Sequence, residues 1–379
     1  MFISESYKEL YEFYNLWNEK NDVIIWGLGK NTKMNIEFIK NNFNVLYIVD
    51  SNEELQNSMY EDILVCSPNK IFEKKNNAKI LISPNDTSII SLLKNKGLVF
   101  NKDFFQLDKI MALISLLKYK KLLIPQIQIS ITTKCSLKCK DCSLKMYKYE
   151  NAKDIEFENI CETIGNFLNF VDEVNHFTLL GGEPLVNKDL VKIISFIKNN
   201  YSKKINSLSI CTNGTIIPND EVLNALKEND VLVKISDYSN TLKYEEKINK
   251  LIKKLKEYKI EYRQNKIDEW VDLYNLSSEK NKENMDNCGM FAASINDNRL
   301  FYCNLQWSAL NLNIVKDNEN DYLRLDKLDN KNFDDKIKFL SYYLGFNKNS
   351  QLSICYKCNG IAQYEDKVIQ SAKQFDGIN

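Results

Sequence analysis

Three cysteines, Cys135, Cys139 and Cys142, are the residues whose type and spacing most directly indicate chemistry. They follow the apolar run 127–132 in a C-x3-C-x2-C pattern, and a tight loop can turn their sulfurs toward a common point. Thiolates are soft ligands that suit iron–sulfur clusters, copper or zinc. Because a four-iron cluster needs four ligands, three cysteines leave one iron open to a ligand that is not protein.

A zinc site or a redox pair is the alternative interpretation of this triplet. Structural zinc sites usually close with a fourth cysteine or a histidine. The chain has one histidine, His176, at the far end of a predicted strand, and no fourth cysteine lies beside the triplet. We interpret His176 as structural, and the pattern favours a cluster with an open iron.

A second motif, Gly181-Gly182-Glu183-Pro184, follows the apolar stretch 177–180. The two glycines allow close approach of the backbone, and the proline holds the carboxylate in place. A carboxylate and free carbonyl groups at the end of a strand can hold an ammonium group.

The two motifs, each after a predicted strand, resemble those of the radical S-adenosylmethionine superfamily, and the similarity covers about residues 125–360. The resemblance implies a four-iron cluster on the triplet, whose open iron binds the amine and carboxylate of S-adenosylmethionine. It implies that residues 181–184 hold the amine, with Ser236, in the stretch ISDYS, as a further cofactor-binding candidate. Asp141 departs from the family, in which an aromatic residue is common before the third cysteine.

The family's chemistry follows from the resemblance. One electron, from a donor such as flavodoxin or ferredoxin, cleaves the cofactor to a 5'-deoxyadenosyl radical, which abstracts a hydrogen atom from a substrate. A non-enzymatic cluster or scaffold protein is the alternative, and the GGEP motif argues against it.

Four further cysteines, Cys288, Cys303, Cys355 and Cys358, can close a complete tetrahedral site. Residues 294–303 around them predict a hairpin with an Asp-Asn turn. Structural zinc is one interpretation. The order of hairpin cysteine and late C-x-x-C pair resembles the twitch domain, a short form of the SPASM extension, which implies a second, auxiliary four-iron cluster.

Three cysteines remain. Cys66 and Cys161 lie in apolar neighbourhoods and are expected to pack as small hydrophobes. Cys211 ends a predicted strand, where its thiol could donate a hydrogen atom to a substrate radical. Side chains alternate along a strand, so only one of Cys211 and Thr212 points inward.

Strands and helices alternate from residue 125 onward, which predicts a parallel sheet with helices outside. The resemblance specifies this α/β fold as a partial (β/α)6 barrel with its site at the carboxyl ends of the strands. We expect the barrel over residues 125–276, a connecting helix over 106–124, and the twitch-like domain over 277–379.

Residues 1–105 predict a Rossmann-like accessory domain. A buried strand from Val23 leads into Gly27-Leu-Gly29, and a second strand ends at Asp50, which would meet a ribose. Thr32 occupies the position of the third glycine of the dinucleotide motif, so we expect weak or no NAD binding. A degenerate domain that docks a substrate or partner is the favoured alternative.

The composition excludes several classes of function. Lys plus Arg and Asp plus Glu are 51 each in 379 residues, which gives no electrostatic case for nucleic acid or an anionic membrane. No apolar run is long enough to span a bilayer, and the first residues are unlike a secretory signal. Ten cysteines without such a signal indicate a reducing compartment, and the cytoplasm is expected.

The main hypothesis for the reaction is hydrogen abstraction from a sugar, cyclitol or nucleotide-linked sugar, with oxidation of a carbinol. Proteins that resemble this one, which carry the stretch 268–272, are associated with polysaccharide and small-metabolite gene neighbourhoods. An epimerase and a peptide-modifying maturase are the alternatives. The candidates for substrate contact are Asp237, Tyr238, Arg263, Trp270, Arg299, Asn304 and Trp307.

Overall fold

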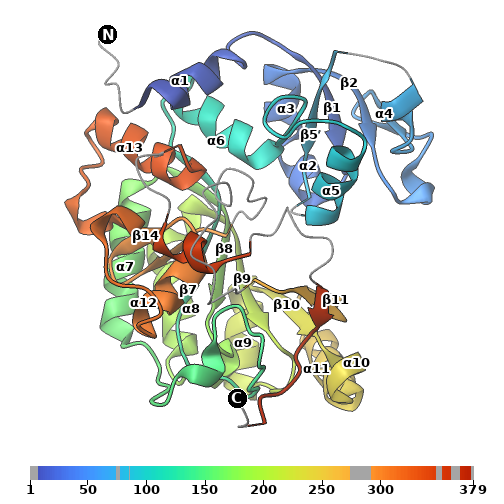
Figure 1. Ribbon diagram of the computed structural model, residues 1–379. Helices are drawn as coiled ribbons and strands as arrows, with labels where there is room; N and C mark the ends of the chain where they lie inside the picture. Colours follow the sequence, from blue (N-terminus) through green and yellow to red (C-terminus); the bar gives the residue numbers. More distant parts are fainter. Residues whose placement is uncertain are drawn as a thin grey trace. The chain divides into compact units, whose positions relative to one another are not determined.

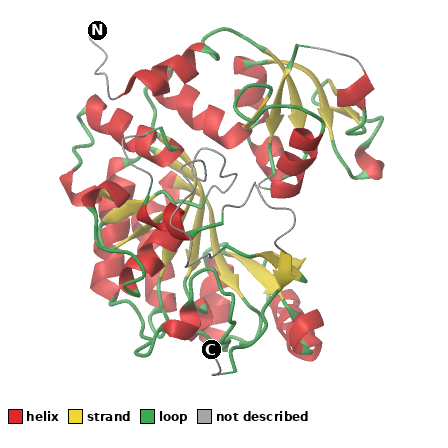
Figure 2. Cartoon of the chain, viewed as in Figure 1, coloured by secondary structure: helices red, strands yellow, loops and turns green. Residues whose placement is uncertain are grey.

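The computed structural model describes residues 7–73, 77–84, 86–273, 292–346, 352–359 and 368–376. The chain divides into two compact units, Met1–Lys120 and Lys121–Asn379, called the N-terminal and the C-terminal unit below. Each unit is a mixed α/β structure built on a largely parallel sheet (Figure 1; Figure 2). The α/β class predicted from the alternation of strands and helices is therefore confirmed.

The N-terminal unit holds a six-stranded sheet in the order β3-β4-β2-β1-β5-β6. Strand β1 pairs in parallel with β2 on one side and with β5 on the other, so the chain reverses its direction across the sheet beside β1. This is the strand order of a Rossmann-like sheet. The strands are β1 (Asp22–Trp26), β2 (Asn44–Val49), β3 (Met59–Tyr60), β4 (Ile63–Cys66), β5 (Lys79–Ile82) and β6 (Phe104–Gln106).

Six helices accompany this sheet among the described residues. They are α1 (Lys8–Asn15), α2 (Lys30–Met34), α3 (Ile36–Asn42), α4 (Lys70–Glu73), α5 (Thr87–Asn95) and α6 (Leu107–Leu117). Helix α6 is shorter than the helix expected over 106–124, because Lys120 takes a left-handed φ of +59°. Leu123 and Ile124 already pair with the next strand of the C-terminal unit.

The C-terminal unit is built on an eight-stranded sheet in the order β11-β10-β9-β8-β7-β13-β14-β15. Strands β7 to β11 pair in parallel with their neighbours, and β13 pairs in parallel with β7. Strands β11 and β15 stand at open edges, as the partial barrel requires. The strands are β7 (Leu123–Ser130), β8 (Glu173–Leu180), β9 (Ile205–Thr212), β10 (Leu232–Asp237), β11 (Tyr262–Lys266), β13 (Ser294–Asn296), β14 (Arg299–Phe301) and β15 (Leu323–Arg324).

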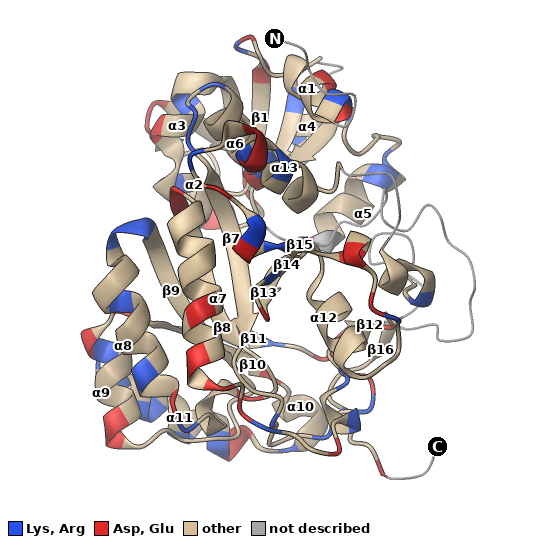
Figure 3. Cartoon of the chain, turned by 90° about the vertical axis from the view of Figure 1, so that its left-hand side faces the viewer, with Lys and Arg blue, Asp and Glu red and all other residues tan. Residues whose placement is uncertain are grey.

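Amphipathic helices follow the parallel strands and bury one apolar stripe each. In α7, Ile160, Ile164 and Phe167 recur at helical spacing and are at most 1% exposed. Figure 3 shows Lys and Arg beside Asp and Glu on the outer helices, so their outer surface carries both signs of charge. The helices are α7 (Phe157–Phe170), α8 (Leu190–Tyr201), α9 (Asp220–Glu228), α10 (Ser239–Leu242), α11 (Glu245–Glu257), α12 (Asn304–Asn311) and α13 (Phe333–Leu344).

Strand β11 begins only at Tyr262. Lys259 takes a left-handed φ of +56°, and the N–H of Ile260 donates to the carbonyl of Leu255, which ends α11 in a compact turn. The chain is free to pair with β10 only after this turn.

A small two-stranded ladder lies beyond β11. Strand β12 (Glu269–Val271) pairs antiparallel with β16 (Val368–Gln370), which joins segments far apart in the sequence. None of the helices in the described ranges has the length and apolar character that crossing a bilayer would take.

Candidate functional site

The loops that carry the cysteine triplet and the GGEP motif leave the carboxyl ends of neighbouring parallel strands. The cysteine triplet follows β7, and the GGEP motif follows β8. Asn213 follows β9, and Tyr238 follows β10. Since these ends share one edge of the sheet, the fold brings the two predicted motifs together.

The two glycines of the GGEP motif lie directly against the backbone that leads into the cysteine triplet. The N–H of Gly182 donates to the carbonyl of Thr132 at 2.9 Å, and the N–H of Glu183 donates to the carbonyl of Lys134 at 2.8 Å. Gly181 has a φ of +145°, and a Cβ there would overlap the Thr132 carbonyl. A Cβ on Gly182 would overlap the Lys134 carbonyl and approach Cys135.

Replacing Gly182 with alanine is expected to reduce iron loading of the triplet by at least about tenfold, because the new methyl group displaces the backbone beside Cys135. Iron content after anaerobic reconstitution measures this. Gly29→Ala is the matched control, because no atom lies within 4 Å of the added Cβ. Equal iron in both variants would contradict the expectation.

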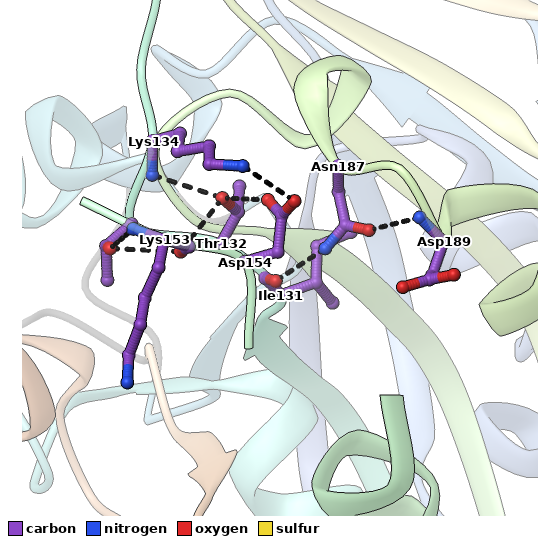
Figure 4. Close-up of polar contacts among 8 residues, drawn as sticks. Ile131, Thr132, Lys134, Lys153, Asp154, Asn187 and Asp189 are labelled. Carbon is purple, nitrogen blue, oxygen red and sulfur yellow. Dashed lines mark hydrogen bonds and ion pairs between the residues drawn. The ribbon is translucent and has the colours of Figure 1, made fainter. Parts of the chain in front are cut away.

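A buried carboxylate fixes the start of the cysteine loop. Asp154, which is 9% exposed, accepts from the Thr132 hydroxyl at 2.8 Å and from the Lys134 ammonium at 2.9 Å (Figure 4). The Thr132 hydroxyl also accepts from the N–H of Lys134. On the other side, the amide of Asn187 donates to the Ile131 carbonyl at 2.6 Å. The loop therefore leaves β7 in one direction, held from two sides.

Glu183 is fully buried and connects the motif to the loop after β9. One carboxylate oxygen accepts from the N–H of Leu185 at 3.1 Å, and the other accepts from the N–H of Asn213 at 2.8 Å. Burial raises the pKa of this carboxyl from 4.5 to about 7, although hydrogen bonds from Asn213, Thr212 and Leu185 oppose the rise. An ammonium group that contacts Glu183 as expected must therefore bind carboxylate oxygens that also accept from backbone N–H groups.

The cysteines of the triplet lie close enough to one another for their charges to interact. Burial raises the pKa of Cys135 to about 12 and that of Cys139 to about 11, and each thiol is further raised by Cys142. A buried thiolate here is stable only beside positive charge, which a metal centre supplies. Two amides face the sulfurs: Asn213 Nδ2 lies 3.7 Å from Cys135 Sγ, and Gln374 Nε2 lies 3.4 Å from Cys139 Sγ.

Among the described residues, no three Cys, His, Asp or Glu side chains converge closely enough to hold a single ion. A four-iron cluster places each cysteine on a different iron, so its sulfurs stand further apart than the ligands of one ion. The partly buried, mutually interacting thiols and their amide donors fit such a cluster.

Cys211 faces the side of the sheet opposite the helices, called the inner face below. Its thiol lies 3.7 Å from the Ser236 hydroxyl, whereas Thr212 accepts from the N–H of Gly214 within its own loop. Tyr238 packs edge-on against Trp270, with ring centroids 5.3 Å apart. Burial, then Cys211, raises the pKa of Tyr238, and Cys139 and Cys142 contribute, so these groups share one neighbourhood.

Several predicted substrate contacts have structural partners instead. Asp237 accepts from the N–H of Ser239 and from Gln264. The Trp307 indole is 1% exposed and donates to Asp297 at the hairpin turn. Arg299 pairs with Asp317 and lies over the Tyr322 ring, and the buried Asn304 begins α12. Arg263 is exposed on the edge strand β11.

The described part of the second cysteine group agrees with a hairpin. Strands β13 and β14 pair antiparallel, and Asp297 and Asn298 both have positive φ, as a tight Asp-Asn turn requires. Cys303 precedes α12, and Cys355 lies in the 3-10 helix η8 (Ser353–Lys357). Gln306 of α12 accepts from the N–H of Ile354, which brings these two segments together. Cys288 lies outside the described residues.

The Rossmann-like turn of the N-terminal unit uses its polar groups internally. The Asp50 carboxylate accepts from the N–H of Leu28 at 2.7 Å and of Asn52 at 2.8 Å. Thr32 is fully buried, and its hydroxyl contacts the Gly27 carbonyl and the Ser83 hydroxyl. The carboxylate expected to meet a ribose is thus occupied by the chain.

We therefore expect the full chain to bind NAD weakly, with a dissociation constant in the millimolar range or above. Titration calorimetry measures this, and a micromolar constant would show that Asp50 releases its backbone partners for the ribose. Asp50→Asn is the comparison variant. It should weaken the hydrogen bonds from Leu28 and Asn52 without creating affinity for NAD.

Sequence reasoning missed three polar residues of the site. The N–H of Asn213 donates to Glu183, and its side-chain amide lies 3.7 Å from the Cys135 sulfur. Lys234 donates to the Thr178 hydroxyl on the inner face at 3.2 Å. The alternation of β10, which places Lys234 on the same face as Ser236, was an available signal. Gln374 had no such signal, because its partners lie more than two hundred positions away.

The protein resembles characterised proteins over part of its length. A probable GTP 3',8-cyclase of Methanococcus maripaludis is 37% identical over 90 residues, which are 24% of this chain and 29% of that protein. The Fe-coproporphyrin III synthase of Methanosarcina barkeri is 34% identical over 119 residues, 30% of this chain and 27% of that protein. The chain thus spans less than a third of the length of both relatives.

Solved structures match parts of the chain at low identity and low TM-score. The structure of BtrN in complex with AdoMet and 2-DOIA covers 68% of this chain, at 15% identity and a TM-score of 0.37, and 98% of BtrN is covered. Native anSMEcpe with bound AdoMet covers 37% of the chain, at 22% identity and a TM-score of 0.32, with 43% of that chain covered. The family model of the radical SAM superfamily matches residues 129–274, which hold both predicted motifs. Residues 129–274 are therefore a radical SAM domain.

Proposed function

We propose that this protein oxidises a carbinol carbon of a sugar, cyclitol or nucleotide-linked sugar. When bound, the cluster and S-adenosylmethionine supply a 5'-deoxyadenosyl radical, which removes one hydrogen atom from the substrate. Loss of the hydroxyl proton, and transfer of one further electron to the auxiliary cluster proposed below, would then leave a carbonyl group. Cys135, Cys139 and Cys142 would hold the cluster, and residues 181–184 with Ser236 would hold the cofactor.

The observation that carries this proposal is the polar inner face beside the two motifs. The hydroxyls of Thr178 and Ser209 lie 2.9 Å apart on neighbouring strands, and the Lys234 ammonium donates to Thr178. Cys211 and Ser236 continue this polar surface toward the carboxyl ends of the strands. Hydroxyl and ammonium groups at such an edge match a substrate with several hydroxyl groups.

Positive charge on the inner face favours the nucleotide-linked sugar among these classes. Lys234 and Arg263 are register partners on the parallel strands β10 and β11, so their side chains leave the same face. Burial lowers the pKa of the Lys234 ammonium, and the positive charge of Arg263 lowers it further. Within the described part of the chain, no carboxylate forms a salt bridge with either residue, and a phosphate group would balance both charges.

The test is substrate-dependent formation of 5'-deoxyadenosine. The reconstituted enzyme is incubated with S-adenosylmethionine, a reductant and separate panels of sugars, cyclitols and nucleotide-linked sugars. The expected result is stimulation, with loss of two hydrogens from the substrate, by a nucleotide-linked sugar. Lys234→Gln should then raise KM about tenfold, whereas Lys227→Gln on the outer helix α9 should leave KM unchanged. Stimulation only by uncharged compounds would contradict the charge assignment.

An epimerase is the second candidate, because the Cys211 thiol lies on the inner face and could return a hydrogen atom. Turnover in heavy water separates the two reactions. An epimerase would place deuterium at an inverted carbon, and Cys211→Ala would abolish this. The dehydrogenase proposal expects no deuterium at carbon and a carbonyl product in both proteins.

We also propose that Cys288, Cys303, Cys355 and Cys358 hold an auxiliary four-iron cluster. Cys303 directly precedes α12 and Cys355 lies in η8, so the hydrogen bond between these two segments supports the proposal. Four protein ligands leave no open iron, which suits electron acceptance better than substrate binding. Reconstituted protein should contain about eight irons per chain, four for each cluster. About four irons with one zinc would identify structural zinc instead.

A further inference from the structure

Residues 371–375, called the C-terminal strap, contact the cysteine loop through one isolated antiparallel bridge and its flanking backbone hydrogen bonds. Cys139 and Gln374 form an antiparallel bridge. The N–H of Lys140 donates to the Lys373 carbonyl at 2.8 Å, and the N–H of Phe375 donates to the Lys138 carbonyl at 2.6 Å. The backbone on both sides of Cys139, the second cysteine of the triplet, is thus held by a distant segment.

The strap is itself anchored at both ends. Ser371 is fully buried, its hydroxyl donates to the Ile267 carbonyl at 2.5 Å, and its N–H donates to the Asp268 carbonyl at 2.9 Å. The β12–β16 ladder immediately precedes it. At the other end, the Phe375 ring packs on Tyr147, with centroids 4.9 Å apart. These contacts fix where the side chain of Gln374 points.

The amide of Gln374 has a defined orientation. Its oxygen accepts from the N–H of Lys138 at 2.8 Å, so its nitrogen must lie on the other side. That nitrogen donates to the Ala372 carbonyl at 2.7 Å and to the Cys139 sulfur at 3.4 Å. The geometry gives each of its two N–H groups one acceptor. Cys139 itself is 8% exposed, so little water competes for its sulfur.

We propose that Gln374 sets the reduction potential of the cluster held by the triplet, through an N–H···S hydrogen bond to Cys139. Reduction adds negative charge to the cluster and its sulfurs, and a donor to sulfur stabilises that added charge. The hydrogen bond therefore raises the potential and makes the cluster easier to reduce. Gln374 is a positioning and tuning residue, since it touches a ligand rather than the substrate.

The test compares two substitutions that separate the sulfur bond from the backbone bond. Gln374→Glu keeps an oxygen for the N–H of Lys138 but has no N–H for the sulfur. Gln374→Met has a similar length and neither group. The control is Gln370→Met, which changes the same residue type at an exposed position of β16.

Reduction of the anaerobically reconstituted proteins is followed by electron paramagnetic resonance at controlled potentials. The signal that changes when S-adenosylmethionine is added identifies the triplet's cluster. We expect the ratio of reduced to oxidised cluster at a fixed potential to fall about tenfold in Gln374→Met, about 59 mV for one electron. The fall should be larger in Gln374→Glu, because its negative charge also opposes reduction. Gln370→Met should match the wild type.

An unchanged potential in the Gln374 variants that load iron would overturn the proposal and leave the strap a purely structural role. If Gln374→Met loads no iron, Gln374→Glu, which preserves the Lys138 bond, still gives the measurement. No substrate is needed, so this result is independent of which reaction the enzyme catalyses.

Discussion

Simultaneous replacement of Cys135, Cys139 and Cys142 with alanine is expected to abolish formation of 5'-deoxyadenosine. This expectation rests on the radical SAM domain match, which includes the three cysteines, and on the partial burial of Cys135 and Cys139. Iron should fall by about four per chain, the content of one cluster. Anaerobic reconstitution, iron assay and detection of the nucleoside by mass spectrometry measure both effects.

Cys66→Ala and Cys161→Ala are matched controls, because both cysteines lie away from the two predicted cluster groups in the sequence. Each should retain full iron and full cofactor cleavage. A triple variant that still cleaves S-adenosylmethionine would remove the basis for a radical mechanism in this chain, whatever the fate of the auxiliary site.

Wild-type stability relative to the Glu183→Gln variant is expected to fall as the pH rises from 4.5 to 8. The folded pKa of Glu183, about 7, lies above the ordinary 4.5, so the folded state favours the protonated form. The associated stability is fully present below pH 4.5 and is lost as the pH rises through about 7. The difference corresponds to about 3 kcal/mol.

Urea unfolding of both proteins at several pH values tests this expectation. Glutamine cannot ionise. Its amide nitrogen would face one of the two backbone N–H groups, so two donors would meet, and the resulting destabilisation should not vary with pH. Glu221→Gln, at an exposed position of α9, should follow the wild-type pH dependence. A constant difference between wild type and Glu183→Gln would mean that Glu183 titrates normally.

The same titration predicts an opposite trend in cofactor binding. If Glu183 also meets the ammonium of S-adenosylmethionine, that positive charge favours the carboxylate. Affinity should therefore increase as the pH rises through about 7. Glu183→Ala should bind the cofactor weakly and show no such increase in this range.

Local sequence carried most of the information about the C-terminal unit. The apolar runs before Cys135 and Gly181 predicted β7 and β8, because strands buried on one face and followed by glycine or cysteine loops have few alternatives. The end of the helix expected over 106–124 was wrong because Lys120 takes a positive φ, and nothing in a lysine signals that conformation.

The supporting residues of the site could not be predicted in the same way. Asp154, Asn213 and Gln374 act through partners from other segments. Asn and Gln are common in this chain, and each occurrence has the same local pattern whether or not it meets a sulfur. Only the folded arrangement distinguishes them, because hydrogen-bond partners at long sequence separation leave no periodicity.

The C-terminal strap also orders the steps by which the protein is made. The N–H of Lys138 and the side chain of Gln374 are 236 positions apart, so the cysteine loop leaves the ribosome long before its partner exists. During that interval the N–H groups of Lys138 and Lys140 lack the partners that the strap supplies. A cluster inserted at this stage would sit in a loop lacking both the strap and the amide donor. Maturation of the cluster site into its final form is therefore completed only after synthesis has passed residue 375.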